Sequence, residues 1–227
     1  MRDLTLIIPA KNESESLPIV LNELKKLNYN INIVLHKSDH KTIDSLSKSN
    51  VKIIYQQDLG YGDALIYAIN RCETKYFCIF NADGSFDPSE IGKMFKFMIS
   101  ENLDFVFGSR YQKNASSDDD TIITLIGNYI FTTLGKIFFG LKLTDILYTF
   151  VIGKTKDANE LNLYKKDFSF CVELPIKAKL NGHKIVSIPC HERPRIAGKK
   201  KVNAFKDGFL ILKSMIKLFF SYKFKSK

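Results

Sequence analysis

The sequence predicts an α/β fold with a mainly parallel, doubly wound sheet. Two observations favour it. Short runs rich in β-branched and aromatic residues alternate with helical patterns, and polar residues directly follow several of these runs. Strands joined by crossover helices form parallel sheets with helices on both faces. The predicted strands are residues 4–8, 31–35, 51–55, 76–80 and 105–109.

The first helical pattern is the clearest. Pro18 lies early in it, where proline is tolerated, and its apolar residues fall on one face. This stripe consists of Leu17, Val20, Leu21, Leu24 and Leu27. Further helices are predicted over residues 61–71 and 88–100, which completes the alternation that a doubly wound sheet requires.

Size and charge predict a single domain with a basic tail. The 227 residues, 45% of them apolar, are enough to bury one substantial core. We expect the domain to cover residues 1–203 and a basic amphipathic helix or tail to cover residues 204–227. The net charge of +10 is concentrated late in the chain and favours nucleic acid, anionic lipid or phosphorylated substrates as partners. We expect no nucleic-acid partner, because no aromatic and basic recognition pattern accompanies the charge.

Cysteine usage indicates a reducing compartment. Cys72, Cys78, Cys171 and Cys190 form no C-x-x-C pair and lie in apolar surroundings, which predicts buried free thiols. The four histidines show no metal-ligand spacing. A strand pattern begins almost directly after Met1, so we expect no signal peptide and a cytoplasmic location.

An acidic turn follows the fourth predicted strand. The apolar run 76–80 leads into Asn81, Asp83 and Asp87. Ligands of open α/β sheets bind beyond the carboxyl ends of the strands, and hard oxygen ligands there suit Mg²⁺ or Mn²⁺. The turn therefore indicates a metal-bound phosphate substrate, although the same residue types also form ordinary strand exits.

Three further segments are candidates for ligand contact. Residues 9–13 follow the first strand, where a polar loop often touches a nucleotide base or ribose. Gly60 and Gly62 open a helix, where small residues let a phosphate or ribose approach free N–H groups. Arg110 ends the fifth strand and suits bidentate phosphate contact. The first two segments are equally compatible with simple turns.

The order and spacing of these pieces resemble the family 2 glycosyltransferases of GT-A fold, particularly the dolichyl- or polyprenyl-phosphate sugar transferase branch. The resemblance covers nearly the whole chain. Asn81 stands where the family's D-x-D motif has its first carboxylate, and the turn after the second strand and the sequence 144–150 also depart from the family pattern. The matching segments are residues 7–13, 60–64, 81–88, 108–111, 170–173 and 195–201.

The resemblance implies an inverting transfer of a sugar from a nucleotide-diphosphate donor, assisted by Mg²⁺ or Mn²⁺. Asp83 and Asn81 would hold the metal, and Asp83 and Arg195 would act in catalysis. Gly198 would let a basic loop close over the diphosphate, although a lysine run is also typical of a solvated surface. The implied donor-binding residues are Pro9, Ala10, Asn12, Glu13, Gly60, Gly62, Asn81, Ala82, Asp83, Arg195 and Lys201.

Two acceptors remain open, a lipid phosphate and a glycan. A lipid phosphate is already an anionic nucleophile, whereas a sugar hydroxyl requires a general base. Asp145 is the leading candidate for that base, and Arg110, Asp119 and Glu173 are the predicted acceptor-binding residues. The acidic run 118–120 serves equally well as an N-terminal cap of the helix that follows it.

Two apolar segments favour membrane contact. Residues 122–141 approach the length of a membrane span but contain Asn128 and Lys136. Residues 205–224 form a basic amphipathic pattern suited to anionic headgroups, or a core helix with lysines at its edge. We expect a peripheral enzyme at the inner face of the plasma membrane, acting in cell-surface polysaccharide or glycolipid synthesis. A nucleotidyltransferase and a non-catalytic sugar-nucleotide-binding scaffold are the alternatives.

Overall fold

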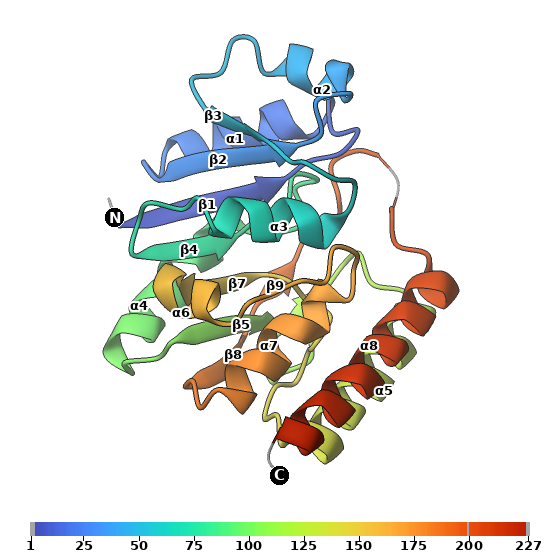
Figure 1. The fold of residues 1–227 in the computed structure, drawn as a ribbon. Helices are drawn as coiled ribbons and strands as arrows, with labels where there is room; N and C mark the ends of the chain where they lie inside the picture. The colour runs from blue at the N-terminus through green and yellow to red at the C-terminus, as the bar shows by residue number, and fades with distance from the viewer. Residues whose placement is uncertain (1–2, 199, 226–227) are drawn as a thin grey trace.

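The computed structural model describes residues 3–198 and 200–225. A seven-stranded sheet forms its centre in the order β3-β2-β1-β4-β7-β5-β8 (Figure 1). All five predicted strands are present, at bounds within one residue of those expected. A separate parallel pair consists of β6, Ser116–Ser117, and β9, His191–Glu192. The main strands are β1 Leu4–Pro9, β2 Asn30–Leu35, β3 Lys52–Tyr55, β4 Tyr76–Ile79, β5 Phe105–Ser109, β7 Val151–Lys154 and β8 Ile185–Pro189.

The sheet is mainly parallel, as predicted, with one exception in its middle. β7 runs antiparallel to both of its neighbours, β4 and β5. Gly153 lies opposite Phe77 on one side and Phe105 on the other. A Cβ atom at Gly153 would lie 2.5 Å from the ring of Phe105, so only glycine leaves room for the two aromatic side chains.

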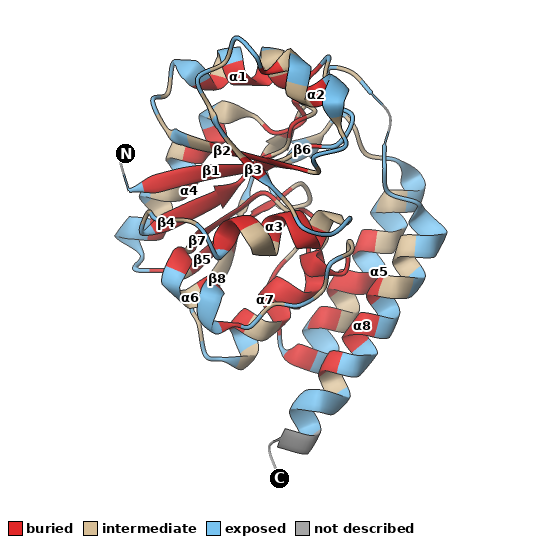
Figure 2. Cartoon of the chain, turned by 45° about the horizontal axis from the view of Figure 1, so that its top comes forward, coloured by how far each residue is buried: buried red, intermediate tan, exposed pale blue. Residues whose placement is uncertain are grey.

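Helices cover both faces of the sheet. One hydrophobic layer contains buried residues of α1 and α4, and the other contains buried residues of α3, α6 and α7 (Figure 2). The three helices predicted in the first half of the chain are all present, and α1 begins with Pro18 in its first turn. The helices are α1 Leu17–Lys25, α2 His40–Ser45, α3 Tyr61–Ile69, α4 Pro88–Ser100, α5 Ile122–Phe139, α6 Thr155–Glu160, α7 Phe170–Leu180 and α8 Ala204–Lys225.

The helices α5 and α8 lie side by side at one end of the molecule and pack on α7 (Figure 1). α5 begins with a capping box between Thr121 and Thr124 and ends at Gly140, whose φ of 63° is left-handed. A third apolar cluster joins the three helices. Its largest contributors are Phe131, Phe139, Ile176, Ile211, Met215 and Leu218.

The outer sides of this helix pair are apolar as well. We call their exposed apolar side chains the two-helix face. By length and composition α5 is long and apolar enough to cross a membrane, and 28% of it is buried inside the protein. The two-helix face consists of Ile122, Ile123, Leu125, Ile126, Tyr129, Ile130, Ile137 and Phe138 of α5, and Phe205, Phe209, Leu212, Ile216, Phe220 and Tyr222 of α8.

Candidate active site

Three acidic side chains from separate loops meet beyond the carboxyl ends of the parallel strands. Glu13 follows β1, Asp83 follows β4, and Asp119 follows β5 and the short β6. Parallel strands place these loops at the same edge of the sheet, which is where open α/β sheets bind ligands. The sequence predicts a ligand site at this edge, built in part from these residues.

A basic segment crosses the three carboxylates. We call residues 193–201 the strap, of which Lys199 lies outside the described residues. Arg195 Nη2 lies 3.5 Å from Asp83 Oδ2 and 3.3 Å from Asp119 Oδ2. Lys200 Nζ lies 3.2 Å from Asp119 Oδ2, and Lys201 pairs with Glu13. Each carboxylate therefore faces a cation supplied by the strap.

The turn that carries Asp83 is ordered by its own side chains. Asp83 Oδ1 accepts hydrogen bonds from the backbone N–H of Ser85 at 3.1 Å and from its hydroxyl at 2.8 Å. The amide of Asn81 donates to the same hydroxyl at 3.3 Å. Asp87, also singled out in the sequence, caps α4 by accepting from the N–H of Ser89.

The residues present fit a magnesium or manganese ion. Asp83 Oδ2 faces the guanidinium of Arg195, so this site already accommodates positive charge, and Asn81, which is bonded to the same Ser85 hydroxyl as Asp83, carries an amide oxygen. Mg²⁺ is commonly held by one or two protein carboxylates together with substrate phosphates. Asp83 and Asn81 would hold such an ion.

The loop after β1 is fixed by its neighbours. Ala10 continues from Pro9 and donates its N–H to Val34 at 2.8 Å. The N–H of Asn12, at a left-handed φ of 52°, donates to Asp39 Oδ2 at 2.7 Å. Asp39 also caps α2, so the segment after β2 supports the loop that presents Glu13.

The two predicted phosphate-binding glycines have another use in this fold. A Cβ atom at Gly60 would lie 2.1 Å from the carbonyl oxygen of Lys166, and one at Gly62 would lie 2.0 Å from that of Lys165. The N–H of Asp63 donates to Lys166 O at 3.0 Å. The segment before α7 therefore covers the start of α3, and the glycines make room for backbone at that point.

Glu173 holds this covering segment in place and lies apart from the three acidic loops. Its carboxylate is fully buried and accepts from the N–H groups of Tyr164 and Lys165, the latter at 2.8 Å. Lys177, one turn later on α7, pairs with it at 2.8 Å. Its predicted contact with an acceptor remains a prediction.

Arg110 and Asp145 form a buried ion pair. Arg110 Nε donates to Asp145 Oδ2 at 2.8 Å and Nη2 donates to Oδ1 at 3.1 Å, while Nη1 reaches Glu192 at 3.3 Å. Burial acts to lower the pKa of Arg110, but Asp145 and Glu192 raise it well above its ordinary value. Burial raises the pKa of Glu192, which Arg110 partly offsets. The predicted phosphate contact of Arg110 and base role of Asp145 would require these groups to leave their partners.

The three aspartates of the acidic run before α5 contact different partners. Asp118 lies 3.3 Å from His191 Nε2, and Asp119 faces the strap. Asp120 accepts from the N–H of Thr121 at 2.9 Å and from the hydroxyls of Tyr111 and Thr124. Both predicted roles therefore have a structural basis, since Asp120 stabilises the start of α5 and Asp119 reaches the candidate site.

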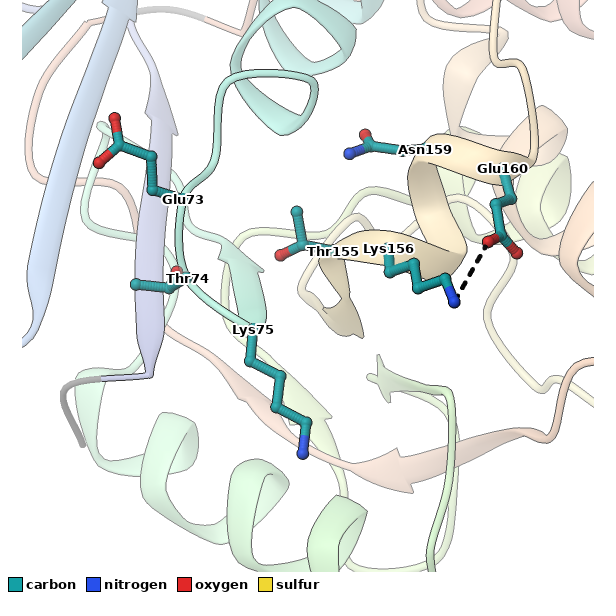
Figure 3. A pocket seen from close by; sticks show the side chains of 7 residues that line it. All are labelled: Glu73, Thr74, Lys75, Thr155, Lys156, Asn159 and Glu160. Carbon is teal, nitrogen blue, oxygen red and sulfur yellow. Dashed lines mark ion pairs between the residues drawn. The ribbon is translucent and has the colours of Figure 1, made fainter.

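A large open cavity of about 680 Å³ lies at the opposite edge of the sheet (Figure 3). Its lining residues precede β4 or follow β7, whereas Asp83 lies beyond the other end of β4. On the wall that α6 forms, Lys156 pairs with Glu160 at 3.8 Å. The cavity lies at the amino end of β4, whereas open α/β sheets bind ligands beyond the carboxyl ends of their strands, so we place the candidate site at the acidic loops.

A group with metal-binding potential also lies at that opposite edge. His183 Nδ1 lies 3.6 Å from Asp104 Oδ2 and 3.9 Å from Asp157 Oδ2. Lys154 Nζ already pairs with Asp104 at 2.6 Å. This group could not be predicted from the sequence, because its members are far apart in the chain. It is separate from Asp83 and does not belong to the candidate site.

Solved structures define the class of fold. The chain is similar to a mycobacterial protein with a TM-score of 0.78 and 10% identity, covering 96% of this chain and 74% of that one. It is also similar to glucosyl-3-phosphoglycerate synthase from Mycobacterium tuberculosis, solved with Mn²⁺, UDP and glucosyl-3-phosphoglycerate, with a TM-score of 0.74 and 12% identity over 97% of this chain and 80% of that one. The fold is the GT-A fold, as predicted.

The family follows from the sequence match. Residues 5–161 match the model for glycosyl transferase family 2, and the chain belongs to this family. Relatives include the dolichyl-phosphate hexose transferase of Haloferax volcanii, 23% identical over 95% of this chain and 93% of that protein. Another is the UDP-N-acetylglucosamine–dolichyl-phosphate N-acetylglucosaminyltransferase of Methanococcus voltae, 28% identical over 81% of this chain and 83% of that protein. The predicted resemblance is confirmed.

Proposed function

We propose that this glycosyltransferase transfers a hexose from a nucleotide-diphosphate donor to a lipid phosphate, with inversion at the anomeric carbon. The observation that carries the proposal is the strap, which brings Arg195, Lys200 and Lys201 to the loops that present Asp83, Asp119 and Glu13. A diphosphate with its metal requires both kinds of charge in one place, carboxylates for the metal and cations for the phosphate oxygens.

The donor side is assigned to the loops after β1 and β4. Among the described residues, the Nε of Arg195 is buried without a hydrogen-bond acceptor, so its guanidinium keeps a donor for an incoming phosphate oxygen. Lys201 lies on Glu13 and is positioned to move to the same phosphate. Mg²⁺ or Mn²⁺, when bound, supplies positive charge that stabilises the departing diphosphate. The remaining proposed donor contacts are Pro9, Ala10, Asn12, Asn81 and Ala82.

A lipid phosphate is the acceptor that best fits the surroundings of Asp145. A phosphate oxygen attacks the anomeric carbon directly, so the reaction needs no side chain to remove a proton. Asp145 is fully buried and paired to Arg110, which suits a positioning role better than a general base. The names of the Haloferax and Methanococcus relatives, both dolichyl-phosphate transferases, support this choice.

The two-helix face supports a membrane location for the acceptor. α5 begins directly after the acidic run that contains Asp119, so its exposed apolar side chains start next to the candidate site. Exposed lysines on the same two helices suit anionic headgroups. These lysines are Lys136, Lys206, Lys213, Lys217 and Lys223. We therefore place the enzyme peripherally at the cytoplasmic face of the membrane.

The first test is a donor panel measured by calorimetry. UDP- and GDP-sugars are titrated with and without Mn²⁺ into the wild type and into Asp83→Ala. We expect one nucleotide to bind in a Mn²⁺-dependent manner and this binding to be lost in Asp83→Ala. Glu101→Ala removes a carboxylate at the other end of α4 and should bind as the wild type does.

A second measurement addresses acceptor and stereochemistry. The donor found in the panel is incubated with a polyprenyl phosphate in detergent, and the anomeric configuration of the product is read by NMR. An inverted glycosyl phosphate supports the proposal. Absence of donor binding under every condition would instead favour a non-catalytic scaffold protein. Asn81 in place of a second carboxylate is the observation that supports this alternative.

A further inference from the structure

The turn of residues 83–86 is held from outside by the first part of the strap. Four consecutive carbonyl oxygens of this turn accept hydrogen bonds from Arg193 and Ile196. The N–H of Ile196 donates to Asp83 O, and the N–H of Arg193 donates to Ser85 O, each at 2.8 Å. The acidic turn and the start of the strap are thereby joined along their whole length.

The side chain of Arg193 binds the other two carbonyl groups. Its Nε and Nη2 donate to Gly84 O at 3.1 and 2.9 Å, and Nη2 also donates to Phe86 O at 3.1 Å. Glu23 of α1 accepts from the same Nη2 at 2.9 Å and so orients the guanidinium. A planar, always charged fork suits such a set of converging acceptors better than the point charge of lysine does.

We propose that Arg193 is a positioning residue for Asp83, an inference that rests on the proposed role of Asp83 in metal and donor binding. Gly84 adopts a φ of 83°, so the turn has a conformation that side-chain propensity alone does not enforce. The side chain of Arg193 binds two of the four carbonyl groups and its backbone N–H binds a third, which fixes that conformation. Among the described residues its side chain bonds the turn and Glu23, so it would act on Asp83 through the turn.

The same contacts bind the first part of the strap to the turn. Up to Ile196 the strap is bound to the turn, and the side chain of Ile196 lies over Gly84, where a Cβ atom would come within 2.4 Å of it. Gly198 has a left-handed φ of 80° and is the first residue beyond this bound part with glycine's freedom. Lys200 and Lys201 therefore lie beyond the part of the strap that is bound to the turn.

Hydrogen exchange tests the inference without any ligand. In Arg193→Gln we expect backbone amides to exchange at least about tenfold faster in peptides covering residues 81–87 and 193–198. Exchange in residues 91–100 of α4 should be unchanged. Arg193→Lys should show a smaller effect. Arg71→Gln is the matched control, because its guanidinium contacts only Tyr67 among the described residues. Unchanged exchange in both peptides, or equal loosening of the whole chain, would overturn the inference. Should Arg193→Gln not fold, Arg193→Lys and Glu23→Gln carry the same comparison.

A second readout separates positioning from bulk stability. Calorimetry with Mn²⁺ and each of UDP and GDP should give about tenfold weaker metal-dependent binding in Arg193→Gln than in the wild type, at a temperature where both are folded. Equal affinity would contradict the positioning role. If the wild type binds neither nucleotide, the proposed function fails, while the exchange comparison still decides whether Arg193 holds the turn.

Discussion

At the scale of single residues, buried charged side chains pair with side chains of opposite charge. Asp145 is fully buried, and Arg110 meets both of its oxygens in a bidentate contact. The backbone N–H of Arg110 also donates to Asp145 Oδ2, at 3.1 Å. Such a pair ties the end of β5 to the segment before β7, two regions that border the candidate site. Removal of this ion pair should therefore first lower the stability of the protein.

We expect Asp145→Asn to lower the free energy of unfolding by about 3–5 kcal/mol, because it leaves a buried guanidinium with only Glu192 as a charged partner. Urea denaturation followed by circular dichroism measures the change. Asp118→Asn, whose side chain is 56% exposed, should have little effect. Normal stability together with abolished turnover and intact donor binding would instead restore Asp145 as a base.

Asp104 gives stability a defined dependence on pH. Burial acts to raise its pKa, but hydrogen bonds from Lys154 and from the N–H of Lys184 outweigh this and hold the pKa below the ordinary value of 3.8. The unfolded chain therefore binds this proton more readily than the folded one. The stability that Asp104 contributes is present above about pH 3.8 and is lost as the pH falls through its lower folded value.

Asp104→Asn should accordingly cost about 1–3 kcal/mol at pH 7, the usual range for hydrogen bonds to a charged group. The difference from the wild type should shrink when unfolding is measured by urea below pH 3.8. Glu73→Gln, which removes an exposed ion pair with Lys52, is the control and should show no such trend. A difference that stays constant with pH would rule out the assigned contribution.

At the scale of elements, the α3 glycines make room for a neighbouring stretch of backbone, a contact that the sequence pattern did not indicate, while their predicted donor contact remains a prediction. Gly62 lies where the backbone of residues 165–167 crosses the start of α3. Its replacement by alanine puts a Cβ atom 2.0 Å from one carbonyl oxygen and 2.8 Å from another. Backbone atoms held by Glu173 give way only at a cost.

We therefore expect Gly62→Ala to destabilise the protein by about 1–3 kcal/mol, as overpacked sites do. Gly92→Ala is the matched control, since Gly92 lies within α4 and a Cβ atom there would meet nothing within 4 Å. That variant should gain up to about 1 kcal/mol from helix propensity. Thermal unfolding of both variants measures the contrast, and equal shifts would contradict the crossing described above.

The elements that could be predicted from sequence are those whose signal is local. The strands up to residue 109 and the helices α1, α3 and α4 follow from apolar runs and periodicity, and Asp83 stands out because it directly follows such a run. β7 did not stand out, because four residues that include Gly153 resemble a loop. Arg193 gave no signal at all, since it acts on backbone carbonyls more than 100 positions away in sequence.

At the scale of the whole molecule, charge and apolar surface are placed on the same end. The net charge is +10, and five exposed lysines lie on α5 and α8 among the side chains of the two-helix face. Exposed apolar surface of this extent is typical of interaction sites. Combined with basic residues it favours an anionic bilayer, into which apolar side chains insert while lysines meet headgroups.

We expect the wild type to cosediment with vesicles containing phosphatidylserine, and the double variant Ile126→Glu/Phe209→Glu to bind about tenfold more weakly at unchanged thermal stability. Ile126 is 54% exposed and Phe209 is 67% exposed, so neither change disturbs the core. Ile99→Glu, on α4, is the control and should bind as the wild type does. Vesicle binding that changes neither with the charge of the lipid nor in the double variant would exclude this surface as the membrane contact.

The reversed strand β7 also sets the order in which the protein can be completed during synthesis. β4 and β5 run in the same direction but are not neighbours, because β7 lies between them. When residues 4–109 have left the ribosome, the open edge of β4 waits for residues 151–154, and β5 waits for these residues on one side and for β8 on the other. The turn that carries Asp83 waits longer still, for the N–H donors of Arg193 and Ile196 that bind its carbonyl oxygens. A nascent chain thus receives the last strand of its central sheet just before the residues that hold the turn of Asp83.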